Sequence, residues 1–136
     1  MKHYPALIAW NEADKVFDVR FPDIPEAFSY GKSLEEAKKN AAEVLALMLE
    51  DADAFPEASS VAGADYYSIP LDSAVAFTIW LKSERRKRGL TQTEVADRLG
   101  VKYQVYQKLE KAGTANPTLK TLVKLEQVFG DAILAI

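Results

Sequence analysis

The sequence predicts an α+β protein of two domains, a βββαβ domain at residues 1–71 and an all-α domain at residues 72–136. In much of the first half, apolar residues alternate with a period of two, which is typical of strands, whereas later they recur at helical spacing. Charge is also segregated. Residues 1–73 carry a net charge of −8 and residues 74–136 carry +5, within an overall −3. This asymmetry indicates two modules with different partners.

Three strands are expected before the first helix, and a fourth after it. Phe17, Val19 and Phe21 alternate with charged residues, so they share one face of a strand. The polar segment before them indicates a hairpin turn, and a loop of small residues precedes the last strand. The expected strands are residues 4–10, 16–21, 27–30 and 66–71.

The first helix has a clear start. Ser33 and Glu36 form the pattern of a capping box, in which each side chain bonds a free backbone amide at the helix start. Apolar residues then recur at helical spacing, which predicts one face docked on a sheet. Phe55 and Pro56 are expected to end the helix. The apolar residues are Leu34, Ala37, Ala41, Val44, Leu45, Met48 and Ala52.

The second half contains a strong local motif after a helix expected at residues 74–88 and stopped by Gly89. Thr91 and Glu94 form a second capping box, and Gly100 supplies a tight turn between two short helices. Val95, Ala96 and Leu99 give the first short helix a buried stripe, while Val105 or Tyr106, then Leu109, face inward from the second. This is the layout of a helix-turn-helix.

The motif resembles the lambda-repressor-like, or XRE, family, and the resemblance covers about residues 76–130. It implies that the second helix of the motif enters the major groove, where Gln reads adenine and Lys reads guanine. It implies that Gln92 anchors a phosphate at a helix N-terminus. Lys102 replaces the usual Ser or Thr cap and offers another phosphate contact. The expected DNA-binding residues are Gln92, Lys102, Tyr103, Gln104, Gln107 and Lys108.

The C-terminal end departs from that family, in which a fifth helix is common at this position. Residues 131–136 are mostly apolar, and an exposed apolar end favours self-association. We expect Ile133, Leu134 and Ile136 to pair across a two-fold axis, giving a homodimer or homotetramer. Packing of this segment onto its own domain is the alternative.

The first half combines the hairpin with the string Phe-Pro-Asp-Ile-Pro at residues 21–25, the Gly31 that follows, and Ser-Leu-Glu-Glu-Ala at residues 33–37. With these segments it resembles the HicB antitoxin family over about residues 4–71. It implies a partial RNase H-like fold. It also implies an antitoxin that binds and covers a HicA-like RNA-cleaving toxin, and that represses its own operon through operator DNA.

Toxin contacts are expected at Asp23 and Glu26, and the acidic first half suits a basic partner. An enzyme is not expected. Two-metal RNase H chemistry needs several carboxylates at one place, and the sequence pattern indicates no such set. His3, the only histidine, is read as an ordinary surface residue. No cofactor or metal is expected. The absence of cysteine and of a long apolar run fits a cytoplasmic protein without a membrane span.

Two other functions stay open at this stage. The chain would be a stand-alone transcription regulator if its first domain senses a small ligand. It would be a protein-interaction module if the helical half is a bundle that never touches DNA.

Overall fold

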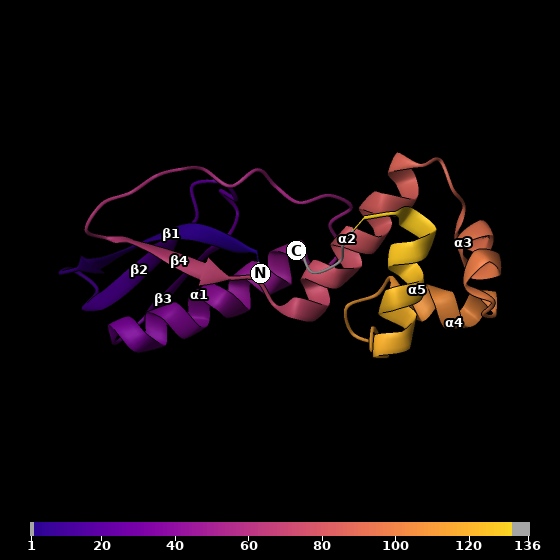
Figure 1. Ribbon diagram of the computed structural model, residues 1–136. Helices are drawn as coiled ribbons and strands as arrows, with labels where there is room; N and C mark the ends of the chain where they lie inside the picture. The colour runs from indigo at the N-terminus through magenta and orange to yellow at the C-terminus, as the bar shows by residue number, and fades with distance from the viewer. Residues whose placement is uncertain (1, 132–136) are drawn as a thin grey trace. The chain divides into compact units, whose positions relative to one another are not determined.

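The computed structural model describes residues 2–131, which form two compact units (Figure 1). The first, here called the sheet unit, consists of residues 2–49 and 56–72. The second, here called the helical unit, consists of residues 50–55 and 73–131. The segment 50–55 therefore belongs to the helical unit although the sheet unit flanks it in sequence.

The sheet unit holds a four-stranded antiparallel sheet in the order β3-β2-β1-β4, with helix α1 on one face (Figure 1). Alternation along β1 decides which face is covered, since Tyr4, Ala6 and Ile8 are all buried. Tyr4 also donates a hydrogen bond from its hydroxyl to the Pro56 carbonyl at 2.8 Å. The elements are β1 (His3–Asn11), β2 (Val16–Arg20), β3 (Phe28–Gly31), α1 (Leu34–Leu49) and β4 (Tyr66–Pro70).

Helix α1 begins as its sequence predicts, and it approaches the sheet closely at β3. The Glu36 amide donates to the Ser33 hydroxyl at 3.1 Å, while the Glu36 carboxylate accepts from the Lys32 amide at 2.8 Å. A Cβ placed on Gly31 would lie 2.7 Å from the Cα of Ala37. Only glycine therefore lets β3 pack so near the first turns of α1.

Two details of this unit differ from the sequence prediction. Helix α1 ends at Leu49, before Ala52, and its buried stripe runs through Ala37, Ala41, Leu45 and Leu49. Met48, expected on the docked face, is 43% exposed. The buried stripe advances in steps of four residues from Ala37, so it reaches Leu49 and leaves the adjacent Met48 outside it. The third strand lies at residues 28–31 rather than 27–30, because Gly31 still pairs with Phe17.

The helical unit buries one continuous apolar core between four helices. Trp80 belongs to this core, stacked on Phe77 at 6.3 Å and edge-on to Phe129 at 5.8 Å between ring centroids. The core continues through Val95, Leu99, Tyr106, Leu109 and Leu125. The helices are α2 (Ser73–Lys87), α3 (Gln92–Leu99), α4 (Tyr103–Leu109) and α5 (Leu119–Phe129).

The segment 50–55 is held on the helical unit by charge and by apolar packing. Asp53 accepts from Arg86 at 2.6 Å and lies 3.8 Å from the ammonium of Lys82. The hydrogen bond from Arg86, with the charges of Lys82 and Arg85, lowers the pKa of Asp53. Phe55 packs against the helical core. Both residues follow α1 directly, so the sequence pattern alone assigned them to the first half.

Candidate nucleic-acid interface

The turn between α3 and α4 is built by local sequence signals. Thr91 accepts from the Glu94 amide at 3.1 Å, and the Glu94 carboxylate accepts from the Thr91 amide at 3.1 Å. Gly100 ends α3 with φ 72°, a left-handed conformation that costs little without a Cβ. Its amide bonds the carbonyls of Ala96 and Asp97, so the last turn of α3 is closed. The helix-turn-helix predicted from spacing is therefore present.

Packing fixes which side of α4 faces outward. Tyr106 and Leu109 are buried in the helical core, whereas Val105 is 49% exposed. The inward position left open between Val105 and Tyr106 thus belongs to Tyr106. Val101 is half-buried and packs against the same core, in the angle between α3 and α4.

The expected DNA-binding residues lie together on the outward side. Tyr103, Gln104 and Lys108 are exposed, and Gln107 is half-buried. Positions 103, 104, 107 and 108 share one side of a helix, since residues three and four apart are neighbours on its surface. Lys102 is the exposed N-cap of α4 and makes no side-chain capping hydrogen bond, because an ammonium has no lone pair to offer the helix amides. Gln92 is the first residue of α3.

Hydrogen bonds connect three of these residues. Tyr103 donates from its hydroxyl to the Gln92 Oε1 at 3.1 Å. Gln107 Nε2 donates to the Tyr103 hydroxyl oxygen at 2.9 Å. The two glutamines and the tyrosine are thus held in one arrangement at the start of the reading helix.

Beneath this surface lies a buried polar cluster that sequence reasoning missed. Arg85 forms two hydrogen bonds with the Glu110 carboxylate, from Nε at 2.7 Å and from an Nη at 3.0 Å. Tyr106 donates its hydroxyl to Glu110, and Gln92 Nε2 donates to it at 2.9 Å. In the sequence, Arg85 is one of several basic residues in the last turn of α2 and carries no sign of a buried partner. The only available signal was Glu110, a carboxylate at the end of an apolar helix.

The cluster keeps Glu110 ionised despite its burial. Burial alone would raise the pKa of Glu110, but hydrogen bonds from Arg85, Tyr106 and Gln92 outweigh it and lower the pKa below its usual value. The pKa of the Tyr106 hydroxyl is raised far above its ordinary range by burial and by its bond to Glu110. Tyr106 therefore stays protonated and remains a donor.

Comparison with known proteins agrees with both halves of this architecture. Residues 4–70 match the family model described as the HicB-like antitoxin of bacterial toxin-antitoxin systems, and residues 81–130 match a helix-turn-helix model. Antitoxin HicB 1 of Photorhabdus laumondii subsp. laumondii is 37% identical over 105 residues, covering 74% of this chain and 65% of that protein. A UPF0150 protein of Thermotoga maritima is 39% identical over 51 residues, covering 38% of this chain and 68% of that protein.

Residues 4–70 thus form a domain of the HicB-like antitoxin family, and a helix-turn-helix domain follows at residues 81–130. The two resemblances predicted from sequence, to this family and to helix-turn-helix proteins, are confirmed, as is the α+β class. The chain spans 65% of the length of Antitoxin HicB 1.

In the HicB-like domain, the two residues expected to touch a toxin have different surroundings. Asp23 is half-buried, and its carboxylate accepts from the Ser59 amide at 3.0 Å and from the Ser59 hydroxyl. It therefore tethers the long loop before β4 to the loop after β2. Glu26 is exposed. Of the two, Glu26 alone presents a carboxylate without a bond of this kind among the described residues.

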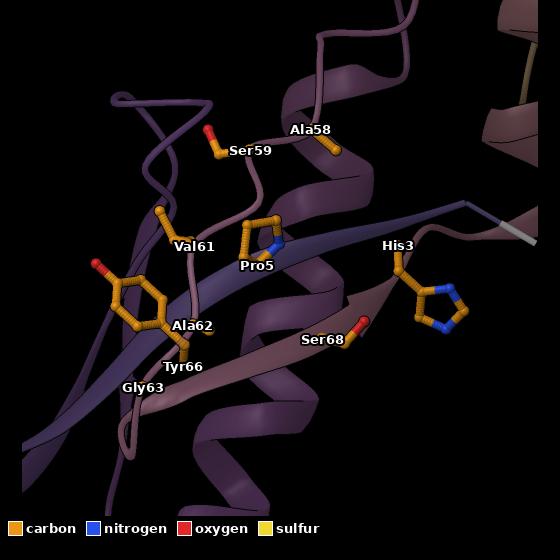
Figure 2. Close-up of a pocket in the computed structure, with 9 residues that line it drawn as sticks. All are labelled: His3, Pro5, Ala58, Ser59, Val61, Ala62, Gly63, Tyr66 and Ser68. Carbon is orange, nitrogen blue, oxygen red and sulfur yellow. The ribbon is translucent and has the colours of Figure 1, made fainter.

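The same loop closes over β1 and β4 and leaves an open cavity of about 370 Å³ (Figure 2). Figure 2 shows the imidazole of His3 and the ring of Tyr66 at opposite ends of the lining. The nine lining residues include no carboxylate, lysine or arginine. The lining residues are His3, Pro5, Ala58, Ser59, Val61, Ala62, Gly63, Tyr66 and Ser68.

For the remaining predictions, the structure gives information only on residues 2–131. Ile133, Leu134 and Ile136, expected at a subunit contact, lie outside the described residues. Between residues 2 and 131, no group of three or more His, Asp or Glu side chains is placed to hold a metal ion. No helix in that range has the length and apolar character needed to span a membrane.

Proposed function

We propose that the chain is the antitoxin of a type II toxin-antitoxin system. Its sheet unit binds and neutralises a HicA-like RNA-cleaving toxin, and its helical unit represses the operon that encodes both proteins. The observation that carries the proposal is the presence, in a chain with a HicB-like domain, of a capped helix-turn-helix whose outward side carries Tyr103, Gln104 and Lys108.

The DNA-binding half rests on the chemistry of α4. Amide and ammonium side chains on one exposed helix side suit the donor and acceptor pattern of the major groove. The +5 charge of residues 74–136 favours approach to phosphates, and Lys102 and Gln92 lie at helix starts where phosphates bind well. The −8 of the first half keeps that half away from DNA.

Gel-shift titration of the chain on the DNA upstream of its own reading frame tests this half. Gln104→Ala and Lys108→Ala are expected to weaken binding at least fivefold, because each removes a side chain placed to read a base. The charge-matched control is Lys39→Ala, an exposed residue of α1, which is expected to bind like the wild type. Equal behaviour of all three variants would remove α4 as the reading helix.

The toxin-binding half rests on charge and on the family. A basic RNA-cleaving protein is attracted by the acidic sheet unit, and complementary charge speeds association. Co-expression with the basic protein encoded by the adjacent reading frame is the test, scored as relief of growth arrest. Glu26→Lys is expected to reduce relief more than Glu43→Lys, the same charge reversal at an exposed residue of α1. Failure of the wild-type chain to relieve arrest would end the antitoxin assignment.

We further propose that the chain acts without catalysis and as a dimer or tetramer. A magnesium-dependent nuclease assay with purified chain is expected to show no cleavage of RNA or DNA. Dimeric binding predicts two half-sites about one helical turn of DNA apart, or a multiple of it. Sedimentation of a chain lacking residues 131–136 tests whether that end holds the subunits together, and an unchanged dimer would reject its role.

The cavity beneath the loop before β4 supports one second candidate function, a regulator that senses a small ligand. A lining without carboxylate, lysine or arginine suits a small, weakly polar molecule. The two functions differ in one result: the antitoxin relieves arrest by its neighbour, whereas a stand-alone regulator does not.

A further inference from the structure

The outward side of α4 is connected to the buried ion pair by a continuous series of hydrogen bonds. The series runs from Arg85 to Glu110, from Glu110 to Gln92, and from Gln92 to Tyr103 and then Gln107. Each member is defined by which atom donates and which accepts. The direction of the series can therefore be worked out from its buried end.

Glu110 fixes the orientation of the first amide. Because Arg85 holds Glu110 ionised, its carboxylate can only accept hydrogen bonds. Gln92 must then present its NH₂ group to Glu110, as observed at 2.9 Å, and its Oε1 must point away. The amide of Gln92 cannot turn over without placing an oxygen against a buried anion.

The orientation of Gln92 in turn fixes the hydroxyl proton of Tyr103. The Gln92 Oε1 is an acceptor, so Tyr103 must donate to it. A phenol has one proton and two lone pairs, and one lone pair already accepts from Gln107 Nε2. Tyr103, which is 40% exposed, is thus left with a single acceptor site toward solvent or DNA.

We propose that Tyr103 is a specificity-determining residue that reads an exocyclic amine, the N6 amine of adenine or the N4 amine of cytosine. In the major groove these are the donor groups, whereas guanine O6 and N7 and thymine O4 only accept. An isolated tyrosine hydroxyl could bind either kind of base group, because it can donate a hydrogen bond to an acceptor or accept one from a donor. Here the Arg85–Glu110 pair, acting through Gln92, removes that freedom. This inference rests on the proposed DNA-binding function.

The experiment selects binding sites from a library of random DNA duplexes with the full chain and with Tyr103→Phe. The wild type is expected to enrich one base pair per half-site whose preference falls about threefold to tenfold in Tyr103→Phe, with the other positions kept. At that pair, the adenine is then replaced by purine, or the cytosine by pyrimidin-2-one, each lacking the amine. The replacement is expected to weaken wild-type binding by the same factor, and Tyr103→Phe binding by less than twofold.

Gln92→Leu distinguishes the relay from a simple contact. It frees the hydroxyl proton of Tyr103, so the selected pair is expected to admit its reversed orientation, with guanine or thymine facing Tyr103, at a similar frequency. Gln104→Ala serves as the matched control and is expected to change a different position. Thermal melting of each variant confirms that the chain is folded before selection.

The outcomes separate this inference from the proposed function. If the folded wild type selects no sequence, the proposed function fails and the inference fails with it. If it selects a clear site that Tyr103→Phe selects equally well, the function stands and the inference is overturned. A Tyr103-dependent pair that tolerates loss of its amine, or a Gln92→Leu preference identical to the wild type, also overturns it.

Discussion

Removal of Arg85 is expected to destabilise the helical unit strongly, because it leaves Glu110 buried and charged. The side chains of Arg85 and Glu110 are only 12% and 4% exposed. Breaking a buried pair by removing one partner costs about 3–5 kcal/mol. In Arg85→Met, Tyr106 and Gln92 still donate to Glu110, so we expect about 3 kcal/mol. For a unit of this size, that corresponds to a fall in Tm of about 12 °C or more.

The assay is urea unfolding followed by the fluorescence of Trp80 in a Trp10→Phe background. Trp80 packs between Phe77 and Phe129, whereas Trp10 lies in β1, so the remaining tryptophan reports the helical unit alone. The partner variant is Arg85→Met with Glu110→Leu. It replaces both charges by apolar groups, and we expect it to regain most of the loss.

The effect of pH gives a second check on the same reasoning. In the wild type the folded-state pKa of Glu110 is lowered, so its contribution to the unfolding free energy is present above the ordinary carboxyl pKa. That contribution is lost as the pH falls through the lowered value. In Arg85→Met burial is no longer offset by a guanidinium, so the pKa of Glu110 rises and the carboxyl becomes neutral on acidification.

The gap in unfolding free energy between the wild type and Arg85→Met should therefore narrow from pH 7 to pH 4. A gap below about 0.5 kcal/mol at pH 7 would refute the assignment of a buried, structurally required ion pair. So would a gap that stays constant with pH, or a double variant as unstable as Arg85→Met.

The remaining predictions concern local structure. Thr91→Ala removes the α3 capping box and should cost about 1 kcal/mol by urea unfolding, whereas the exposed Thr93→Ala should cost little. Gly31→Ala forces β3 away from α1 and should cost about 1–3 kcal/mol by circular dichroism melting, while Gly113→Ala, which meets open space, should be neutral. Lys102→Ser supplies the missing N-cap of α4. It should stabilise the unit by about 1 kcal/mol in urea, yet reduce the salt dependence of DNA binding by about one phosphate contact.

The sequence predicted well those features that depend on neighbours along the chain. Capping boxes, the glycine at Gly100 and the alternation of Phe17, Val19 and Phe21 with charged residues are signals of this kind, and each led to an element in the expected place. The helix start at Ser33 is another example. Local hydrogen bonds and periodic burial decide such elements almost independently of the rest of the fold.

The features that sequence reasoning missed depend on residues far apart. Glu110 is 25 positions from Arg85, and either residue alone reads as a surface charge. The sequence pattern extends α1 too far, because Ala52 keeps the helical period. In the structure the helix ends at Leu49, and residues 50–55 belong to the helical unit. The sequence offers Asp23 only as a candidate toxin contact, and it does not indicate that the Asp23 carboxylate accepts hydrogen bonds from Ser59, 36 residues later. These contacts follow from the tertiary fold, which no local pattern encodes.

The placement of residues 50–55 bears on how this protein can be divided. The backbone leaves the sheet unit after residue 49, returns at 56 and leaves again after 72, so no single cut separates the two units intact. A C-terminal fragment beginning near residue 72 lacks Asp53 and Phe55. It therefore loses the ion pair between Asp53 and Arg86 and the packing of Phe55 against the helical core. Exchange of helix-turn-helix units between chains of this architecture, by an engineer or by recombination, would need to carry this short insert along with the helices it supports.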